Sequence, residues 1–262
     1  MAEKARIGVI DSGVGGLTFV REILALCPGA DIIYFGDSAN CPYGNQTRER
    51  ILELTFRALS FLQQSHIHVG VIACNTISTL IDTLQSNTAT PLFSVVSPAA
   101  EAVARSGARR VGILGTEFTI AVGTYQKLIQ EINPNIEVAS QGSLHLAALV
   151  DQGAPVQDIE EEIQSRFGPL LEHNPPPETV ILGCTHYPIV KDIFVRRYPD
   201  IEFLDPAVES AKALTLWLKQ QELETKGQGT LKIYTSGTLD VYQRILEQLQ
   251  IPAPCVLEHV IP

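Results

Sequence analysis

The sequence VIACNT at residues 71–76 has a close counterpart in ILGCTH at residues 181–186. Each segment begins with an apolar run typical of a buried strand and continues with a cysteine and polar side chains, where the strand is expected to end. IGVIDS at residues 7–12 and VGILGT at residues 111–116 form a second pair, at nearly the same separation along the chain. Two similar α/β halves, each with a reactive loop, explain both pairs. The alternative is that buried parallel strands simply resemble one another.

Short β-branched runs alternate with longer segments of helical period along the whole chain. This alternation predicts an α/β protein in which parallel sheets are covered by helices. The expected strands span residues 7–10, 32–35, 69–73, 92–95, 111–114, 179–182, 201–204 and 231–234. The expected helices span residues 17–26, 47–64, 76–85, 99–105, 122–132, 156–171, 189–198, 207–220 and 241–250.

The composition is that of an ordinary globular protein and argues against several classes of partner. Of the 262 residues 45% are hydrophobic, and the formal net charge is −10. An acidic chain without a dense basic run is not expected to bind nucleic acid. No stretch of the sequence approaches the roughly 20 apolar residues of a membrane helix, and its first residues lack a signal-peptide pattern. We therefore expect a soluble, cytoplasmic protein with no nucleic-acid or membrane partner.

Five cysteines stand at positions 27, 41, 74, 184 and 255. Their number is odd, their spacing is irregular and no C-x-x-C pair occurs, which argues against a disulfide framework and a structural zinc site. His66, His68, His145 and His173 also lack metal-ligand spacing, so no metal is expected. Cys41 has no counterpart in the repeated segments, and we expect it to take no part in the chemistry.

Cys74 and Cys184 occupy matched positions, each after a predicted buried strand and shortly before a predicted helix. Ligands of open α/β sheets gather at the carboxyl ends of strands, and the start of a helix favours a thiolate. One such cysteine alone would be interpreted as a small buried apolar residue. Two at matched strand ends favour a function.

Two thiols without a cofactor motif suggest proton transfer on two faces of one carbon. One group removes a proton from one face and the other returns a proton to the opposite face, which inverts a stereocentre. Hydrogen-bond donors follow each thiol: Asn75 and Thr76 in one half, Thr185 and His186 in the other. With the adjacent helix starts, these donors can stabilise developing charge and hold a carboxylate.

The glycine-rich sequence DSGVGGL at residues 11–17 allows the backbone to approach a small ligand closely. It does not fit G-x-G-x-x-G, and no P-loop lysine follows, so a dinucleotide or nucleotide site is not supported. Asp11 by itself would be interpreted as the cap of a turn.

Four segments together resemble the signatures of bacterial glutamate racemases, which belong to the aspartate/glutamate racemase superfamily. They are DSGVGGL at residues 11–17, YFGDSANCPYG at 34–44, ACNT at 73–76 and LGCTHYP at 182–188. The pair Gly115-Thr116, followed by Thr119, resembles a fifth. The segments span most of the chain in the order of the family, and the last one, with His186, resembles glutamate rather than aspartate racemases.

The resemblance implies two pseudo-symmetric three-layer α/β domains with mostly parallel sheets and an active site in the cleft between them. The first domain would comprise residues 1–96 and 208–262, and the second residues 97–207. The resemblance also implies a small-molecule substrate, glutamate, no pyridoxal phosphate or other cofactor, and no metal. In the family, the product D-glutamate feeds peptidoglycan synthesis.

The same resemblance assigns roles to individual residues. Cys74 would act as the base toward D-glutamate and Cys184 as the base toward L-glutamate, with Asp11 assisting the first thiol and His186 the second. The substrate-binding residues would be Asp11, Ser12, Tyr43, Gly44, Asn75, Thr76, Thr116, Thr185 and His186.

Three segments depart from the family pattern. Residues 140–151 lack the usual Cys-Pro stretch and glutamate, residues 97–100 lack a glycine after the proline, and residues 205–207 replace a serine-containing turn. These differences leave substrate preference and regulation open.

Three other functions are therefore kept as alternatives: a racemase of aspartate or another amino acid, a catalytically inactive binding homologue, and a cysteine hydrolase using Cys184 and His186. The sequence is compatible with a homodimer, but no residue decides the oligomeric state.

Overall fold

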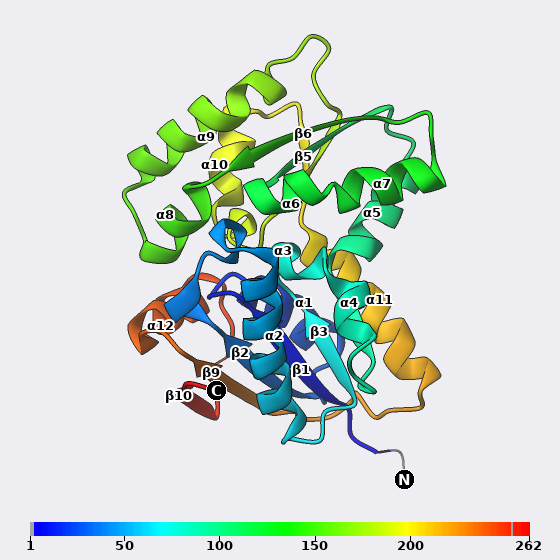
Figure 1. Cartoon of the computed structure of the whole chain (residues 1–262), viewed down its shortest axis with the longest axis vertical. Coiled ribbons are helices and arrows are strands. Elements are labelled where there is room, and N and C mark those ends of the chain that lie inside the picture. Colours follow the sequence, from blue (N-terminus) through cyan, green and yellow to red (C-terminus); the bar gives the residue numbers. More distant parts are fainter. Residues whose placement is uncertain (1–2, 253) are drawn as a thin grey trace.

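The computed structural model describes residues 3–252 and 254–262, which form two parallel sheets with their covering helices (Figure 1). The larger sheet has the strand order β10-β9-β2-β1-β3-β4, the smaller one β6-β5-β7-β8, and every pairing in both is parallel. The α/β prediction is confirmed. The strands are β1 (Arg6–Asp11), β2 (Asp31–Gly36), β3 (Val69–Ile72), β4 (Leu92–Ser94), β5 (Arg110–Thr116), β6 (Glu137–Ser143), β7 (Thr179–Gly183), β8 (Glu202–Leu204), β9 (Leu231–Thr235) and β10 (Val256–His259).

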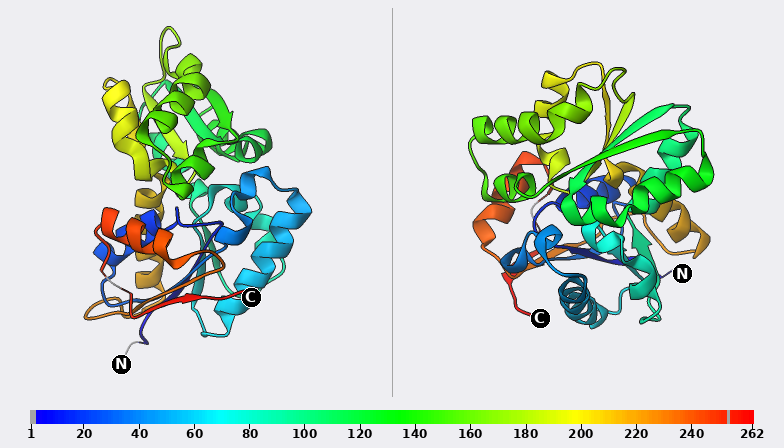
Figure 2. Two further views of the ribbon diagram at one scale, coloured as in Figure 1. Left: turned by 90° about the vertical axis from the view of Figure 1, so that its left-hand side faces the viewer. Right: turned by 45° about the horizontal axis from the view of Figure 1, so that its top comes forward.

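Helices cover both sheets, as the additional views show (Figure 2). None of those in the described part of the chain has the length and apolar character that a membrane crossing needs. The helices are α1 (Leu17–Leu26), α2 (Arg48–Gln63), α3 (Asn75–Ser78), α4 (Ile81–Gln85), α5 (Val96–Arg105), α6 (Glu117–Val122), α7 (Thr124–Ile132), α8 (Leu146–Gln152), α9 (Val156–Leu171), α10 (Lys191–Arg197), α11 (Pro206–Gln220) and α12 (Leu239–Gln248).

The predicted strands form the centres of the sheets, because their runs of buried aliphatic residues are covered on both faces. The last five residues of β1 and all of β3 and β7 are buried. In parallel sheets, this burial gives continuous apolar runs, the pattern visible in the sequence. Core side chains from both halves join in one large cluster, so the two sheets are parts of one packed molecule.

The prediction missed two strands, β6 and β10, and two helices, α6 and α8. Both strands lie at sheet edges, and their residues are mostly exposed or half-buried. Edge strands lack the apolar run by which the central strands were identified. The predicted helix over residues 76–85 is wrong as one unit, since it is interrupted between α3 and α4. The segment after Cys184 begins as a short 3₁₀ helix, Tyr187–Val190, before α10.

The chain passes between the halves twice, and the two connecting helices pack against each other. It leaves the larger sheet through α5 and returns through α11, which also packs on α1 (Figure 1). Ser210 on α11 donates a hydrogen bond to the carbonyl of Val95, just before α5, at 3.1 Å. The predicted domain limits fall at the start of α5 and within α11, and they stay a prediction.

Candidate active site

The loops that follow strands of the two sheets meet around a cavity of about 10 Å³. It lies at the carboxyl ends of the strands, where ligands of open α/β sheets bind. Of the predicted site residues, only Asp11 is absent from its lining. The lining residues are Ser12, Pro42, Tyr43, Gly44, Cys74, Asn75, Thr76, Thr116, Ala147, Cys184, Thr185 and His186.

The halves approach closely at this cavity because two glycines leave room. A side chain at Gly15 would stand 2.7 Å from the backbone of Thr185, and one at Gly44 would collide with Thr116. Each contact joins a loop of the larger sheet to a loop of the smaller one. Gly15, in the glycine-rich segment after β1, thus lets two backbones approach each other, whereas the expected close approach of a small ligand stays a prediction.

Cys74 stands two residues after the end of β3 and immediately precedes α3, and its side chain is almost fully buried. Its Sγ donates a hydrogen bond to Ser12 Oγ at 3.5 Å. Burial, followed by the nearby charge of Asp11, raises the pKa of the Cys74 thiol to about 12. Without a ligand this group is therefore a thiol at neutral pH.

Cys184 follows β7 at the corresponding place in the smaller sheet and lines the same cavity. Its Sγ lies 3.8 Å from Nδ1 of His186. The other ring nitrogen of His186, Nε2, lies 2.9 Å from Oδ1 of Asp151. Cys184, His186 and Asp151 thus form a continuous chain in which both ring nitrogens have a partner.

The electrostatics of this chain favour a protonated imidazole. Burial lowers the pKa of His186, but the hydrogen bonds to Asp151 and then to Cys184 and Cys41 outweigh it, so that the pKa lies well above its usual value. Burial acts in the opposite direction on Asp151, where the interactions with His186 prevail and hold the pKa below its usual value. Each group therefore stabilises the charged form of the other.

Asp11 lies behind the cavity, is fully buried and contacts the opposite half through Thr185. Its Oδ2 accepts a hydrogen bond from the backbone N–H of Gly16 at 2.7 Å, and its Oδ1 accepts one from Thr185 Oγ1 at 3.3 Å. Burial raises the pKa of Asp11, and the charge of His186 partly offsets this shift. No hydrogen bond joins Asp11 to Cys74 within the described residues, so Asp11 influences that thiol through charge and through its neighbour Ser12.

Neutral donors provide the polar part of the cavity wall. Tyr125 donates a hydrogen bond to Asn75 Oδ1 at 2.6 Å, whereas the buried Nδ2 of Asn75 has no partner among the described residues. Thr76, Thr116 and Thr119 form a cluster in which the hydroxyl of Thr116 lies 3.0 Å from that of Thr76 and 2.9 Å from that of Thr119. An unpaired buried amide is costly and is expected to bind a ligand acceptor.

Tyr43 was expected to hold a carboxylate, but its hydroxyl already has a partner. It donates to Oδ2 of Asp37 at 2.7 Å, and Asp37 also accepts a hydrogen bond from Ser236 Oγ at 2.6 Å. The Tyr43 hydroxyl therefore donates to Asp37 rather than to a ligand carboxylate, and the side chain positions the loop before α2.

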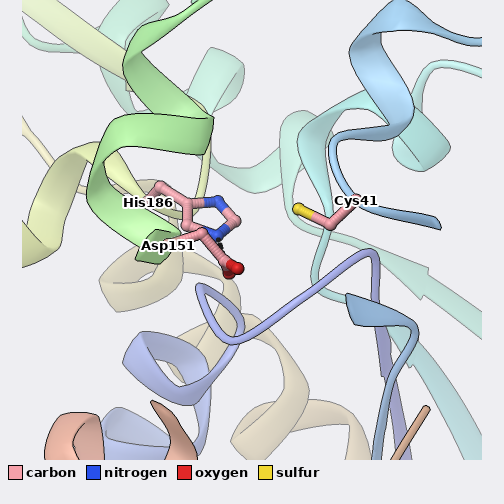
Figure 3. Close-up of side chains that lie close together, drawn as sticks. All are labelled: Cys41, Asp151 and His186. Carbon is pink, nitrogen blue, oxygen red and sulfur yellow. Dashed lines mark hydrogen bonds and ion pairs between the residues drawn. The ribbon is translucent and has the colours of Figure 1, made fainter. Parts of the chain in front are cut away.

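Two residues that were not among the predicted site residues lie at the site, Asp151 and Cys41 (Figure 3). Asp151 lies at the end of α8, a helix that the sequence did not reveal, although the segment containing it had been recognised as unusual. Cys41 was expected to be uninvolved, and yet it approaches His186 from the opposite half. No repeat or spacing identified it, because its place depends on how the halves meet.

Comparison with known proteins gives one consistent result. A family described as Asp/Glu/Hydantoin racemase matches residues 7–214. A glutamate racemase of Desulforudis audaxviator is 33% identical over 94% of this chain and 93% of its own length. One of Geobacter metallireducens is 36% identical over 88% of this chain and 87% of its own length.

Solved structures agree with the sequence comparison. A glutamate racemase from Bacillus anthracis, 29% identical, superposes with a TM-score of 0.89 over 98% of this chain and 97% of its own. One from Francisella tularensis, solved in complex with D-glutamate and 30% identical, has a TM-score of 0.87 over 98% of both chains. An aspartate racemase from Picrophilus torridus shares the fold, with 16% identity and a TM-score of 0.63 over 85% of this chain and 96% of its own.

Proposed function

The chain belongs to the Asp/Glu/Hydantoin racemase family and is an amino-acid racemase, and from this premise we propose that it interconverts L- and D-glutamate with Cys74 and Cys184 as its two acid–base groups. One observation carries the mechanism: the two thiols follow corresponding strands of the two sheets and line one cavity. Such a pair can act on opposite faces of a carbon held between the halves.

The proton balance of the proposed reaction is simple. The thiolate of Cys74 removes the α-proton of D-glutamate, and the thiol of Cys184 gives its own proton to the opposite face. L-glutamate leaves, Cys74 is then the thiol and Cys184 the thiolate, and the enzyme is ready for the reverse conversion. No electrons are transferred, so the chemistry requires acid–base groups and donors for the developing carbanion.

Neighbouring groups support each thiolate in a different way. His186 faces Cys184, and as an imidazolium it places a positive charge whose Nδ1 lies 3.8 Å from the sulfur. In the described part of the chain no cation lowers the pKa of Cys74, and its pKa of about 12 makes its thiolate scarce before substrate arrives. The ammonium group of a bound amino acid would supply the missing positive charge next to it.

The substrate carboxylates would bind to neutral donors. Among the described residues, no lysine or arginine lines the cavity, whereas Asn75 offers an unpaired Nδ2 and the threonine cluster around Thr116 offers hydroxyls. A volume of about 10 Å³ holds about one water molecule. Glutamate is far larger, so the cavity must widen to admit it.

We assign the product to peptidoglycan synthesis because the chain resembles bacterial glutamate racemases. Expression of the protein in a bacterium that requires D-glutamate for growth tests this assignment. Growth without added D-glutamate would support it, and failure of a well-expressed, active protein to restore growth would contradict it.

Exchange of the α-proton in heavy water tests the mechanism. Wild type, Cys74→Ser and Cys184→Ser would each be incubated with D- and L-glutamate. NMR measures the deuterium incorporated at the α-carbon, and chiral chromatography measures the configuration. Wild type is expected to label and invert both enantiomers. In each serine variant the rate of inversion is expected to fall by several orders of magnitude, because an alcohol is a far weaker acid than a thiol.

The outcomes separate the candidate functions. Inversion at the wild-type rate by either variant would refute the two-thiol mechanism. If wild type inverts aspartate or another amino acid and leaves glutamate unchanged, the mechanism stands with a different substrate. Inertness toward a whole panel of amino acids would favour an inactive binding homologue.

A further inference from the structure

The side chains of Cys41, Asp151 and His186, all of metal-ligating type, converge at one place (Figure 3). Ligand atoms of Cys41, Asp151 and His186 all lie within 4.8 Å of one another, the one such group of three among the described residues. Gly13 leaves the space between them free. A side chain there would stand 3.0 Å from Cys41 Sγ, 3.0 Å from Asp151 Oδ1 and 3.4 Å from His186 Nε2.

We propose that Cys41 Sγ, the Asp151 carboxylate and His186 Nε2 form a binding site for a borderline-soft divalent cation of the Zn²⁺ class. A thiolate, an imidazole and a carboxylate are the ligands that zinc prefers, and three of them leave a fourth position for water. A tetrahedral zinc ion holds neighbouring ligand atoms about 3.5 Å apart. Movements of about 1 Å would therefore bring the three atoms into range.

The surroundings permit such movements and give the ion a path. Cys41 stands between two short 3₁₀ helices, Ser38–Asn40 and Tyr43–Asn45, rather than inside a strand. Cys41 and Asp151 each keep some solvent exposure, through which an ion could enter, whereas His186 is buried.

An ion at this position would inhibit the racemase, a consequence that rests on the proposed function. It would occupy the ring nitrogen of His186 that now pairs with Asp151, while Nδ1 continues to face Cys184. Cys41 comes from a loop of the larger sheet, whereas Asp151 and His186 come from the smaller half. The ion would therefore tie the halves together across a cavity that has to open for substrate.

Titration with Co²⁺ tests binding without reference to activity, because a cobalt–thiolate bond gives a charge-transfer absorption band. Wild type is expected to bind one ion per chain with this band. Cys41→Ser is expected to lose the band and to bind at least about tenfold more weakly. Cys255→Ser removes an exposed thiol elsewhere and serves as the matched control, which should behave as wild type.

A third variant identifies the thiol that binds the ion. The catalytic thiols are the competing explanation, and in Cys184→Ser the band is expected to persist. Loss of the band in Cys184→Ser, or its retention in Cys41→Ser, would overturn the proposed ligand set. Circular dichroism of each variant ensures that a lost band is not caused by unfolding.

Inhibition by Zn²⁺ tests the consequence, with each variant compared with its own metal-free rate. Wild type and Cys255→Ser are expected to lose activity as Zn²⁺ rises and to recover it with a chelator, whereas Cys41→Ser should need at least about tenfold more Zn²⁺. Equal sensitivity of all three would refute the inhibitory role. If glutamate is not a substrate, the cobalt titration still decides whether the site exists.

Discussion

Asp151 contacts His186 at 2.9 Å but does not line the cavity, so in the proposed reaction it would act through His186. We expect Asp151→Asn to lower kcat about tenfold or more while KM changes little, because the amide no longer stabilises the imidazolium beside Cys184. Steady-state racemisation of both enantiomers measures this split. Asp200→Asn changes an exposed carboxylate far along the chain and is the control. A parallel rise in KM would instead indicate a substrate-binding role.

The residues of the site were predictable where a strand leads into them. Cys74 and Cys184 each follow a run of buried aliphatic residues, so their place at the carboxyl end of a strand could be deduced from a few positions. Asp151 and Cys41 could not be found in this way. Their positions depend on an unrecognised helix and on the packing of one half against the other, and neither leaves a local pattern.

At the scale of elements, Gly123 separates α6 from α7 in a left-handed conformation with φ of +70°. A side chain there would meet no atom within 4 Å, so substitution tests backbone conformation alone. We expect Gly123→Ala to lower the free energy of unfolding by about 1–2 kcal/mol. Gly123→Asn is the matched comparison and should lose less, because asparagine tolerates this conformation better. Urea denaturation measures both, and equal losses would contradict the explanation.

Strands β5 and β6 show which elements a sequence pattern predicts and which it does not. The central strand β5 carries the apolar run VGIL and was predicted, whereas its neighbour β6 reads EVASQGS and was not. Both belong to one sheet, but β6 lies at its edge and is largely exposed. Its pairing with β5 is determined by tertiary contact, which composition does not record.

At the scale of the whole molecule, Asp205 links stability to pH at the return from the smaller half to the larger. Its carboxylate accepts a hydrogen bond from the backbone N–H of Ala207 at 2.9 Å at the start of α11, and burial raises its pKa from 3.8 to about 6. The folded state therefore favours the protonated acid. This contribution to stability is fully present below pH 3.8 and is lost as the pH rises through about 6.

We expect Asp205→Asn to remove this dependence. Between about pH 4 and 7, the free energy of unfolding of wild type should fall by up to about 3 kcal/mol more than that of the variant. Urea denaturation at a series of pH values measures the difference. Asp200→Asn should retain the wild-type slope, and an unchanged slope in Asp205→Asn would show that this carboxyl is not responsible.

The strand order of the larger sheet differs from the order in which a ribosome synthesises the strands. β9 and β10 are synthesised last, although β9 pairs with β2, one of the first strands made. The smaller sheet is complete once β8 has emerged, while β2 still presents an unpaired edge. A chain terminated before residue 231 would carry that open edge permanently, and open edges pair with other chains. Premature stop codons that remove β9 are therefore expected to yield aggregates rather than a shortened enzyme.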